Sequence, residues 1–192
     1  MSPFPDLDPW LRHWPFRPGE ISAREVRAHD GRTVLLMRVE LGVLQLETEG
    51  RPDGERPGGA ETYLDNLISR SVHEGEAFQL DEEDQQEVDR ELFQFYQRRL
   101  CWKALRRFDR AVADADHTLE LVDFARRHSP DDEWLESHQQ HRIFVLFHRT
   151  EAAALGELER SSPEAAIEEI NMGLTRLREC FDPVKTKATR GS

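Results

Sequence analysis

The 192-residue sequence has only two cysteines, Cys101 and Cys180, and they form no metal-binding or redox motif. Because both fall in apolar segments that favour helix, we interpret them as small buried hydrophobic residues. No stretch approaches 18 consecutive apolar residues, so a membrane-spanning helix is not expected. The first residues have neither a basic start nor an apolar run, so no signal peptide is expected and the sequence predicts a cytoplasmic protein.

Positive charge is also scarce. The chain has 26 Lys and Arg residues against 38 Asp and Glu residues, which gives a formal net charge of −12. Most of the excess falls in residues 61–192, and no basic stripe is long enough to neutralise several phosphates. A field of this sign repels nucleic acids, so we expect neither a nucleic-acid partner nor, without an apolar span, a membrane partner.

Proline and aromatic residues are concentrated in residues 1–19. They are Pro3, Phe4, Pro5, Pro9, Trp10, Trp14, Pro15, Phe16 and Pro18. Prolines fix φ and remove backbone donors, so the pattern predicts an irregular extended arm. Tryptophans are costly to leave in water, so we expect Trp10 and Trp14 to pack on a partner or, more simply, on the chain's own body.

Residues 20–49 are typical of a small antiparallel sheet. Two β-like runs, 21–28 and 32–40, flank the Asp30-Gly31 pair, which favours a type I′ turn with positive φ at both central residues. Apolar and charged residues alternate in the second run, as in a half-buried strand. The alternation changes parity after Gly42, which predicts a bulge or a tight turn. We expect two or three strands, followed by a Gly- and Pro-rich loop at 50–59.

Beyond that loop the sequence predicts helices. We expect them at 60–73, at 82–105 with Asp81 as N-cap, after a tight turn at Arg106-Arg107, at 132–159, and from Pro163 with Ser162 as N-cap. Each long helix carries an apolar stripe that predicts a packed face. The stripe of the last helix consists of Ala166, Ile167, Ile170, Leu174, Leu177 and Phe181. Residues 183–192 have the composition of a flexible tail.

Two helical hairpins in series suggest an internal repeat. Phe108 and Ala111, which follow the turn, match the aromatic and small positions of a tetratricopeptide repeat, and Phe95 and Trp102 fall at aromatic positions of the helix before it. A second copy aligns at Ala153, Ala154, Ala166, Ile170 and Gly173, with Pro163 at the position of the aromatic. Residues 88–180 therefore resemble two tetratricopeptide-like units, which implies antiparallel helix pairs and a groove that binds peptides.

Besides Pro163, the sequence departs from the repeat in two ways, and a second, fainter resemblance is also present. Arg98 and Arg99 stand where the repeat has Leu and a small residue, and the copies are 55 residues apart rather than about 34. Residues 39–46 and 50–54 also resemble uncharacterised bacterial proteins, some of which carry a label borrowed from the UvrB/UvrC helical-hairpin motif. Residues 164–170 can be matched to that motif, which implies a helical interaction hairpin.

A histidine cluster is the main candidate for chemistry. Glu136, His138, His141 and His148 have helical spacing, and imidazoles at such spacing can chelate zinc when three or four ligands converge. The spacing is not that of a His-Glu-x-x-His motif, so surface histidines are the simpler interpretation. Paired acids at 82–84 and 131–133 occupy helix starts, where capping explains them.

We therefore expect an α+β, mostly α protein. Its parts are an arm at 1–19, a β-hairpin or meander with its loop at 20–59, a tetratricopeptide-like helical bundle at 60–182 and a tail at 183–192. The sequence favours a non-enzymatic adaptor or regulator that binds another protein, with possible self-association and with no cofactor. The candidate contact residues are Arg51, Arg56, Tyr96, Arg99 and Trp102. The alternative is a metal-dependent enzyme that uses His138, His141 and His148.

Overall fold

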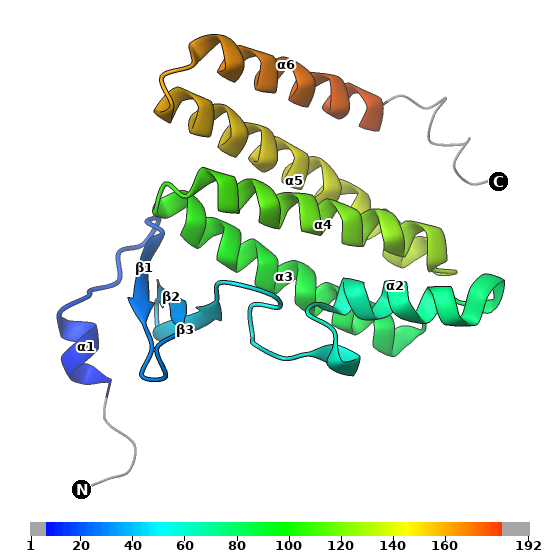
Figure 1. The fold of residues 1–192 in the computed structure, drawn as a ribbon, viewed down its shortest axis with the longest axis horizontal. Helices are drawn as coiled ribbons and strands as arrows, with labels where there is room; N and C mark the ends of the chain where they lie inside the picture. Colours follow the sequence, from blue (N-terminus) through cyan, green and yellow to red (C-terminus); the bar gives the residue numbers. More distant parts are fainter. Residues whose placement is uncertain (1–6, 182–192) are drawn as a thin grey trace, which may run out of the picture.

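A three-stranded sheet lies against one end of a row of long helices (Figure 1). This arrangement comes from a computed structural model of the chain, which describes residues 7–181. The fold is α+β and mostly helical, as predicted. The elements are α1 (Asp8–Arg12), β1 (Ser22–Arg27), β2 (Thr33–Val39), β3 (Gly42–Glu47), α2 (Tyr63–Glu74), α3 (Glu82–Ala104), α4 (Phe108–His128), α5 (Asp132–Glu159) and α6 (Pro163–Cys180), with short 3₁₀ turns at Pro57–Gly59 and Gly75–Ala77.

The strands form an antiparallel meander in the order β1-β2-β3. The turn between β1 and β2 falls at the predicted place, but it is not a type I′ turn. Only Gly31 has positive φ, at 89°, and its N–H donates to the carbonyl of Ala28. A three-residue loop in which a turn is followed by a left-handed glycine closes the hairpin instead.

A tight turn also joins β2 to β3, at the position where the sequence parity changes. Val39 pairs directly with Gly42, which leaves Glu40 and Leu41 as the turn residues. The guanidinium group of Arg38 donates to the carbonyls of Val39 and Gly42, the latter over 2.8 Å. Its Nε atom donates over 2.8 Å to the carbonyl of Trp14, so one buried arginine ties the turn to the N-terminal arm.

The arm covers the outer face of the sheet. Trp14 is buried, and its indole nitrogen donates to Ser22 Oγ over 2.6 Å, as expected for a tryptophan packed on its own chain. β2 is consequently buried on both faces rather than half-buried as predicted, and Val34 and Leu36 are hidden as well as Leu35 and Met37. The side chain of Trp10 lies outside the described residues.

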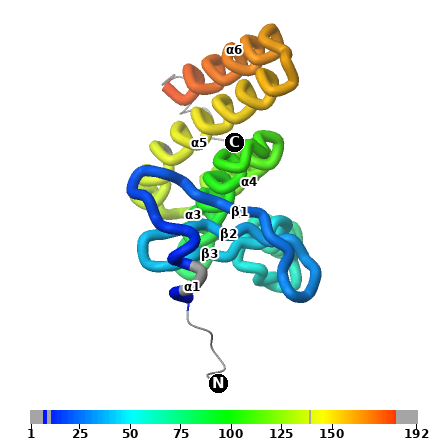
Figure 2. Tube along the Cα trace, turned by 90° about the vertical axis from the view of Figure 1, so that its left-hand side faces the viewer, coloured from blue at the N-terminus to red at the C-terminus, as the bar shows by residue number. Residues whose placement is uncertain are grey.

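Part of the arm is helical, which corrects the prediction of an extended segment. Residues 8–12 form α1 (Figure 2), and its first turn contains Pro9, a position at which a missing N–H costs nothing. An ion pair of 3.7 Å joins Asp8 and Arg12 one turn apart. Residues 1–6 and the tail predicted at 183–192 lie outside the described residues.

Two hydrophobic clusters lie along the α3–α4 pair. The first joins the inner face of the sheet to the C-terminal part of α3 and the start of α4, through residues that include Leu35, Trp102 and Phe108. The second joins α2 to the N-terminal part of α3 and the end of α4, and includes Leu67 and Leu121. The sheet and α2 therefore pack on the same two helices at different points along their length.

The predicted N-caps hold at two helices and fail at a third. Asp81 and Asp84 form a reciprocal capping box at the start of α3, and the Asp131 side chain accepts from the N–H of Trp134 at the start of α5. Ser162 makes no side-chain cap bond to α6, so Pro163 in the first turn is the remaining start signal.

The α3–α4 and α5–α6 turns have the same geometry. Arg106 and Ser161 are 55 residues apart and have φ values of 58° and 59°, the only non-glycine residues with positive φ in the described part of the chain. In each turn the following residue donates to a carbonyl five positions back, Arg107 to Trp102 and Ser162 to Glu157. Arg106 and Ser161 themselves donate to carbonyls three positions back, those of Lys103 and Leu158. The two bonds in each turn are those of a Schellman motif, so the 55-residue offset in the sequence corresponds to a repeated turn.

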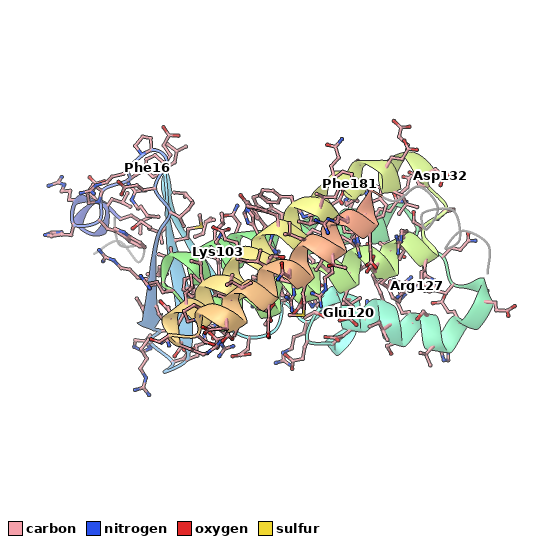
Figure 3. All side chains as sticks on the ribbon, turned by 90° about the horizontal axis from the view of Figure 1, so that it is seen from above. Phe16, Lys103, Glu120, Arg127, Asp132 and Phe181 are labelled. Atoms are coloured by element: carbon pink, nitrogen blue, oxygen red, sulfur yellow. The ribbon has the colours of Figure 1, made fainter. Side chains whose placement is uncertain are left out.

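Helices α3 to α6 form an open row in which each packs mainly on its neighbours in sequence (Figure 1). The last helix, α6, fully buries only Ala166 and Gly173. The apolar stripe predicted for its packed face is largely exposed, which corrects that expectation. The reason is that α6 is outermost in the row and lies over α5 with its other side open (Figure 3).

Candidate functional site

The five residues proposed as contacts do not form one surface. Arg51 and Arg56 lie on the loop between β3 and α2, whereas Tyr96, Arg99 and Trp102 lie on α3. Trp102 is 3% exposed and belongs to the cluster under the sheet, so it holds the sheet to the helices. Of the five, Arg56 is exposed and Tyr96 is half-buried, while Arg51 and Arg99 are buried.

Arg51 points inward and is surrounded by acids. Its guanidinium group lies 2.8 Å from Glu87, 3.3 Å from Asp53 and 3.7 Å from Glu91, and its side chain is 1% exposed. Arg51 Nε also donates to Gln94 Oε1 over 3.3 Å. These contacts fasten the loop to α3, so the side chain of Arg51 holds the fold together and is not free to bind a partner.

The same network holds the start of α2. Glu91 on α3 has no exposed surface, and its carboxylate accepts from the backbone N–H groups of Tyr63 and Leu64 over 2.6 and 3.2 Å. His117 of α4 completes it at 3.0 Å. The first N–H groups of a helix lack partners within the helix, so Glu91 caps α2 from a neighbouring helix.

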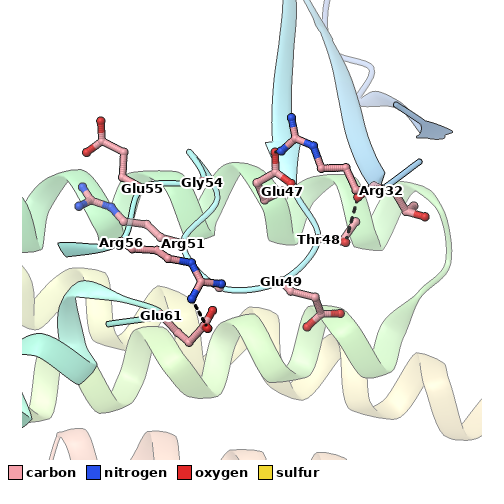
Figure 4. A pocket seen from close by; sticks show the side chains of 11 residues that line it. Arg32, Glu47, Thr48, Glu49, Arg51, Gly54, Glu55, Arg56 and Glu61 are labelled. Atoms are coloured by element: carbon pink, nitrogen blue, oxygen red, sulfur yellow. Dashed lines mark hydrogen bonds and ion pairs between the residues drawn. The ribbon is translucent and has the colours of Figure 1, made fainter. Parts of the chain in front are cut away.

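Arg56 lies at the rim of a recess of about 520 Å³ between this loop and the end of the sheet where β2 begins and β3 ends (Figure 4). Each basic side chain that lines the recess has an acidic partner. Arg56 pairs with Glu61 at 2.7 Å, Arg32 pairs with Glu47, and Arg110 reaches Glu49 from α4 at 2.5 Å. Exposed ion pairs of this kind contribute little energy, and they leave no unmatched charge for an anion to neutralise.

Arg99 differs from Arg51 because its charge is not matched. It has no exposed surface, and its one side-chain hydrogen bond within the described residues runs from NH1 to Thr118 Oγ1 over 3.2 Å. Nε and NH2 have no partner in the part of the chain that is described. Burial, opposed by the charge of Asp114, lowers the pKa of Arg99 to about 10. An arginine buried with two donors unused is costly to the fold.

A ring of α3 lies beside Arg99 and contacts a ring of α5. The guanidinium carbon lies 5.6 Å from the centroid of the Tyr96 ring, and the Tyr96 ring lies 6.0 Å from that of Phe144 on α5. Phe144 in turn contacts His148 at 4.0 Å. Phe144 and Phe147 are 41% and 55% exposed. A buried cation therefore lies near rings that reach the surface.

Two of the predicted histidines join this group. Like Arg99, His141 and His148 each have a buried ring nitrogen, Nε2 and Nδ1, without a partner among the described residues. Burial, and then the positive charge of Lys103 and Arg99, lowers the pKa of His148 to about 4. Burial followed by Arg99 also lowers the pKa of His141. The lysine itself pairs with Glu151 across α3 and α5, near the sheet end of the row (Figure 3). We call Tyr96, Arg99, His141, Phe144 and His148 the α3–α5 cluster.

The third histidine has a different environment. His138 lies 2.7 Å from Asp89 and 2.7 Å from the carbonyl of Trp134, so both of its nitrogens are occupied. Burial lowers its pKa, but these two hydrogen bonds outweigh burial and the net shift is upward. Between residues 7 and 181 no three His, Cys, Asp or Glu side chains are placed to hold a metal ion.

The two cysteines lie far apart in the fold and form no disulfide. Cys101 is buried in the cluster beneath the sheet, where burial raises the pKa of its thiol to about 12. Cys180 is half-buried at the end of α6, and Arg142 contacts its sulfur at 2.9 Å. Both are free thiols, and only Cys101 has the fully buried position predicted for the pair.

Comparisons of the chain with protein-family models, with curated protein sequences and with solved structures found no match. None of the helices in the described part of the chain combines the length and apolarity that crossing a bilayer requires.

Sequence reasoning selected Tyr96 and Arg99 but missed their connection to α5. The pattern contained one usable signal: Arg99 stands at a position where the repeat has a small residue, and His141, Phe144 and His148 share a helix face at spacings of three and four. A large cation at a small-residue position must extend toward a neighbouring helix. Only the structure shows that this helix is α5.

Proposed function

We propose that the chain is a non-enzymatic interaction module that binds a segment of another protein over α3 and α5. The observation that carries this proposal is Arg99, which is fully buried and leaves two guanidinium nitrogens without partners. The Tyr96 ring lies beside its guanidinium group and contacts Phe144 of α5, which is 41% exposed. Rotation of such rings would open a path to the arginine without movement of the helices.

The chemistry of the α3–α5 cluster defines the segment. A carboxylate would accept from the free nitrogens of Arg99, and charge-assisted bonds of this kind are among the strongest that proteins make. His141 and His148 could donate to the same group once protonated, which a nearby anion favours. The exposed Phe144 and Phe147 would contact an apolar side chain beside that carboxylate. The bound segment would thus combine an acidic group with an apolar neighbour.

The resemblance to tetratricopeptide hairpins remains part of this proposal. Those proteins use a surface formed by successive helix pairs, and here α3 and α5 are the first helices of the two pairs. The metal-dependent alternative has no supporting contact in the described residues, because His138 is occupied by Asp89 and Trp134.

A peptide-display selection on the full-length protein tests the proposal. Peptides enriched on the wild type should contain Asp, Glu or a free C-terminal carboxylate next to an apolar residue. The same selection on Arg99→Met should lose the acidic preference. Arg176→Met is a matched control, because it removes an exposed arginine from α6, away from the cluster, and it should select the same peptides as the wild type.

Two results would overturn the proposal. One is a selection that enriches no peptide on the correctly folded wild type. The other is an acidic preference that persists unchanged on Arg99→Met, which would show that another basic residue reads the carboxylate. Far-ultraviolet circular dichroism of each variant verifies that the helices are intact before the selections are compared.

A further inference from the structure

The last helix of the row has one packed side and one open side. α5 is the only described element that makes an extensive contact with α6. The packed side is close, because a Cβ added to Gly173 would come within 2.1 Å of Thr150 Oγ1. The open side exposes 58% of Ile167, 44% of Ile170 and 43% of Leu174.

The exposed apolar residues of α6 have the spacing of a helix seam. Ile167, Ile170, Leu174, Leu177 and Phe181 are separated by three, four, three and four residues. This alternation is the a and d pattern of a coiled coil, which places all five along one narrow stripe. We call these five residues the α6 stripe. Phe181, at its C-terminal end, is 69% exposed.

Charge along α6 is divided between its two halves. The first half has Glu164, Glu168 and Glu169, of which Glu169 pairs with Arg149 of α5, and the second half has Arg176 and Arg178 beside one acid, Glu179. Within residues 7–181 the side chains of Glu164, Glu168, Arg176 and Arg178 form no ion pair. Two such helices side by side in parallel would oppose like charges. In antiparallel orientation each acidic half would face a basic half, and the helix dipoles would also be opposed favourably.

We propose that α6 is a self-association surface, on which the α6 stripe packs against the α6 stripe of a second copy of this chain in antiparallel orientation. A register centred on Met172 places Ile167 opposite Leu177 of the second copy and Ile170 opposite Leu174 of the second copy. Two-fold symmetry repeats each of these contacts. Phe181 then meets Pro163 of the second copy, so the stripe is covered along its whole length.

The flanking charges agree with the same register. Glu164 and Arg178 both lie at the e position of the seam, on its side away from α5. The antiparallel register brings Glu164 of one copy beside Arg178 of the second, once at each end of the interface. The stripe is thus complementary to itself in shape and charge, which identifies a second copy as the occupant rather than an unrelated protein.

The size of the surface sets the strength of the association. α6 has 18 residues and is therefore about 27 Å long. One helix pair of that length lies at the small end of specific interfaces. The association should be reversible, with a dissociation constant on the order of micromolar. It does not use the α3–α5 cluster, so it is independent of the proposed peptide binding.

Sedimentation velocity of the full chain over a range of concentrations tests the proposal. The mass should rise from the 22.4 kDa of one chain toward twice that value as concentration increases. Ile170→Lys combined with Leu174→Lys should hold the protein at the monomer mass, because symmetry brings the new charges together. Met172→Lys adds the same charge to an exposed α6 position outside the stripe, and it should still dimerise.

A charge exchange tests the orientation. Glu164→Arg and Arg178→Glu should each weaken the dimer about tenfold, since each creates a like-charge pair at both ends. The double variant should restore it. Arg176→Glu, which lies off the seam, should leave the dissociation constant within about twofold. A monomer at all concentrations, or a double variant weaker than either single variant, would overturn the proposal.

Removing the chain beyond α6 provides a second test of the proposal. If residues 183–192 covered the α6 stripe, a chain shortened after residue 182 would dimerise while the full chain stayed monomeric. That outcome would assign the stripe to the chain's own tail and would also overturn the proposal. Equal dissociation constants for the two forms are the expected result.

Discussion

Arg51 and Arg99 are both buried, with 2% and 0% of their surface exposed, and both reach into the helical row. Arg51 is enclosed by Glu87, Glu91 and Asp53, and thereby holds the loop after the sheet against α3. Arg99 has Thr118 as its only side-chain hydrogen-bond partner in residues 7–181, and it lies beside the Tyr96 ring, which contacts Phe144 of α5.

The contrast shows that burial by itself does not reveal what a charged side chain does. A buried cation whose N–H groups all have partners contributes to the stability of the fold. Removing it leaves its acidic partners buried without a counter-charge. A buried cation whose donors are free costs stability in the isolated protein. Stability therefore does not explain the presence of such a residue, and we propose that Arg99 serves to bind an anion.

The largest effect should follow from Arg51→Met. The methionine fills much of the same volume but leaves the buried Glu91 and its neighbours Glu87 and Asp53 without their cation. Loss of one partner from a buried ion pair costs about 3–5 kcal/mol. Urea unfolding followed by circular dichroism should show a loss of this size in the free energy of unfolding.

Arg56→Met is the matched control for that measurement. Arg56 is on the same loop, but its ion pair with Glu61 is exposed, with 63% and 57% of the two side chains accessible. Its removal should change the free energy of unfolding by less than about 0.5 kcal/mol. Equal losses in the two variants would mean that the loop as a whole, and not the buried network, provides the stability.

The next largest effect should be a pH dependence of stability that arises from the α3–α5 cluster and not from the network around Arg51. Burial, Lys103 and Arg99 lower the pKa of His148 to about 4, while Glu151 and the ring of Phe144 are its other close neighbours. A histidine whose pKa is lower in the folded state binds fewer protons there than in the unfolded chain. Stability is therefore lost as pH falls below the unfolded pKa of about 6.5, and the loss continues to about pH 4.

The expected loss from His148 is about 1 kcal/mol between pH 7 and pH 5.5. Thermal or urea unfolding of His148→Gln over this range should show a shallower pH dependence than the wild type. Some dependence will remain, because the lowered pKa of His141 acts in the same direction. His138 acts oppositely, since its raised pKa stabilises the fold at low pH. An unchanged slope in His148→Gln would contradict the assignment.

Local patterns in the sequence predicted most of the secondary structure. The Asp-Gly turn, the parity change at Gly42 and the acidic caps at Asp81 and Asp131 all lie at boundaries found in the structure. These signals succeed because turns and caps depend on residues within a few positions of each other. The type of the first turn was wrong, because a type I′ turn was inferred from Asp30-Gly31 alone whereas the loop has three residues.

Properties set by distant contacts were not predictable in the same way. The fully buried β2 depends on the arm, and the exposed stripe of α6 depends on its position at the end of the row. The different roles of Arg51 and Arg99 depend on which acids approach them from other elements. No spacing within one helix or loop carries that information, so three of the proposed contact residues proved to be buried.

The smallest change in stability should follow from Arg99→Met, which makes this variant the sharpest test of the comparison. Replacing a buried, poorly matched charge by an apolar side chain of similar volume is commonly neutral or stabilising. The variant gives up one hydrogen bond to Thr118 and the attraction of Asp114, and in exchange removes two unpartnered donors. We expect urea unfolding to show no loss of stability, in contrast to Arg51→Met. A loss as large as that of Arg51→Met would show that Arg99 holds the fold together in the same way. Arg99 would then stabilise the folded chain, and its burial would be no evidence for anion binding.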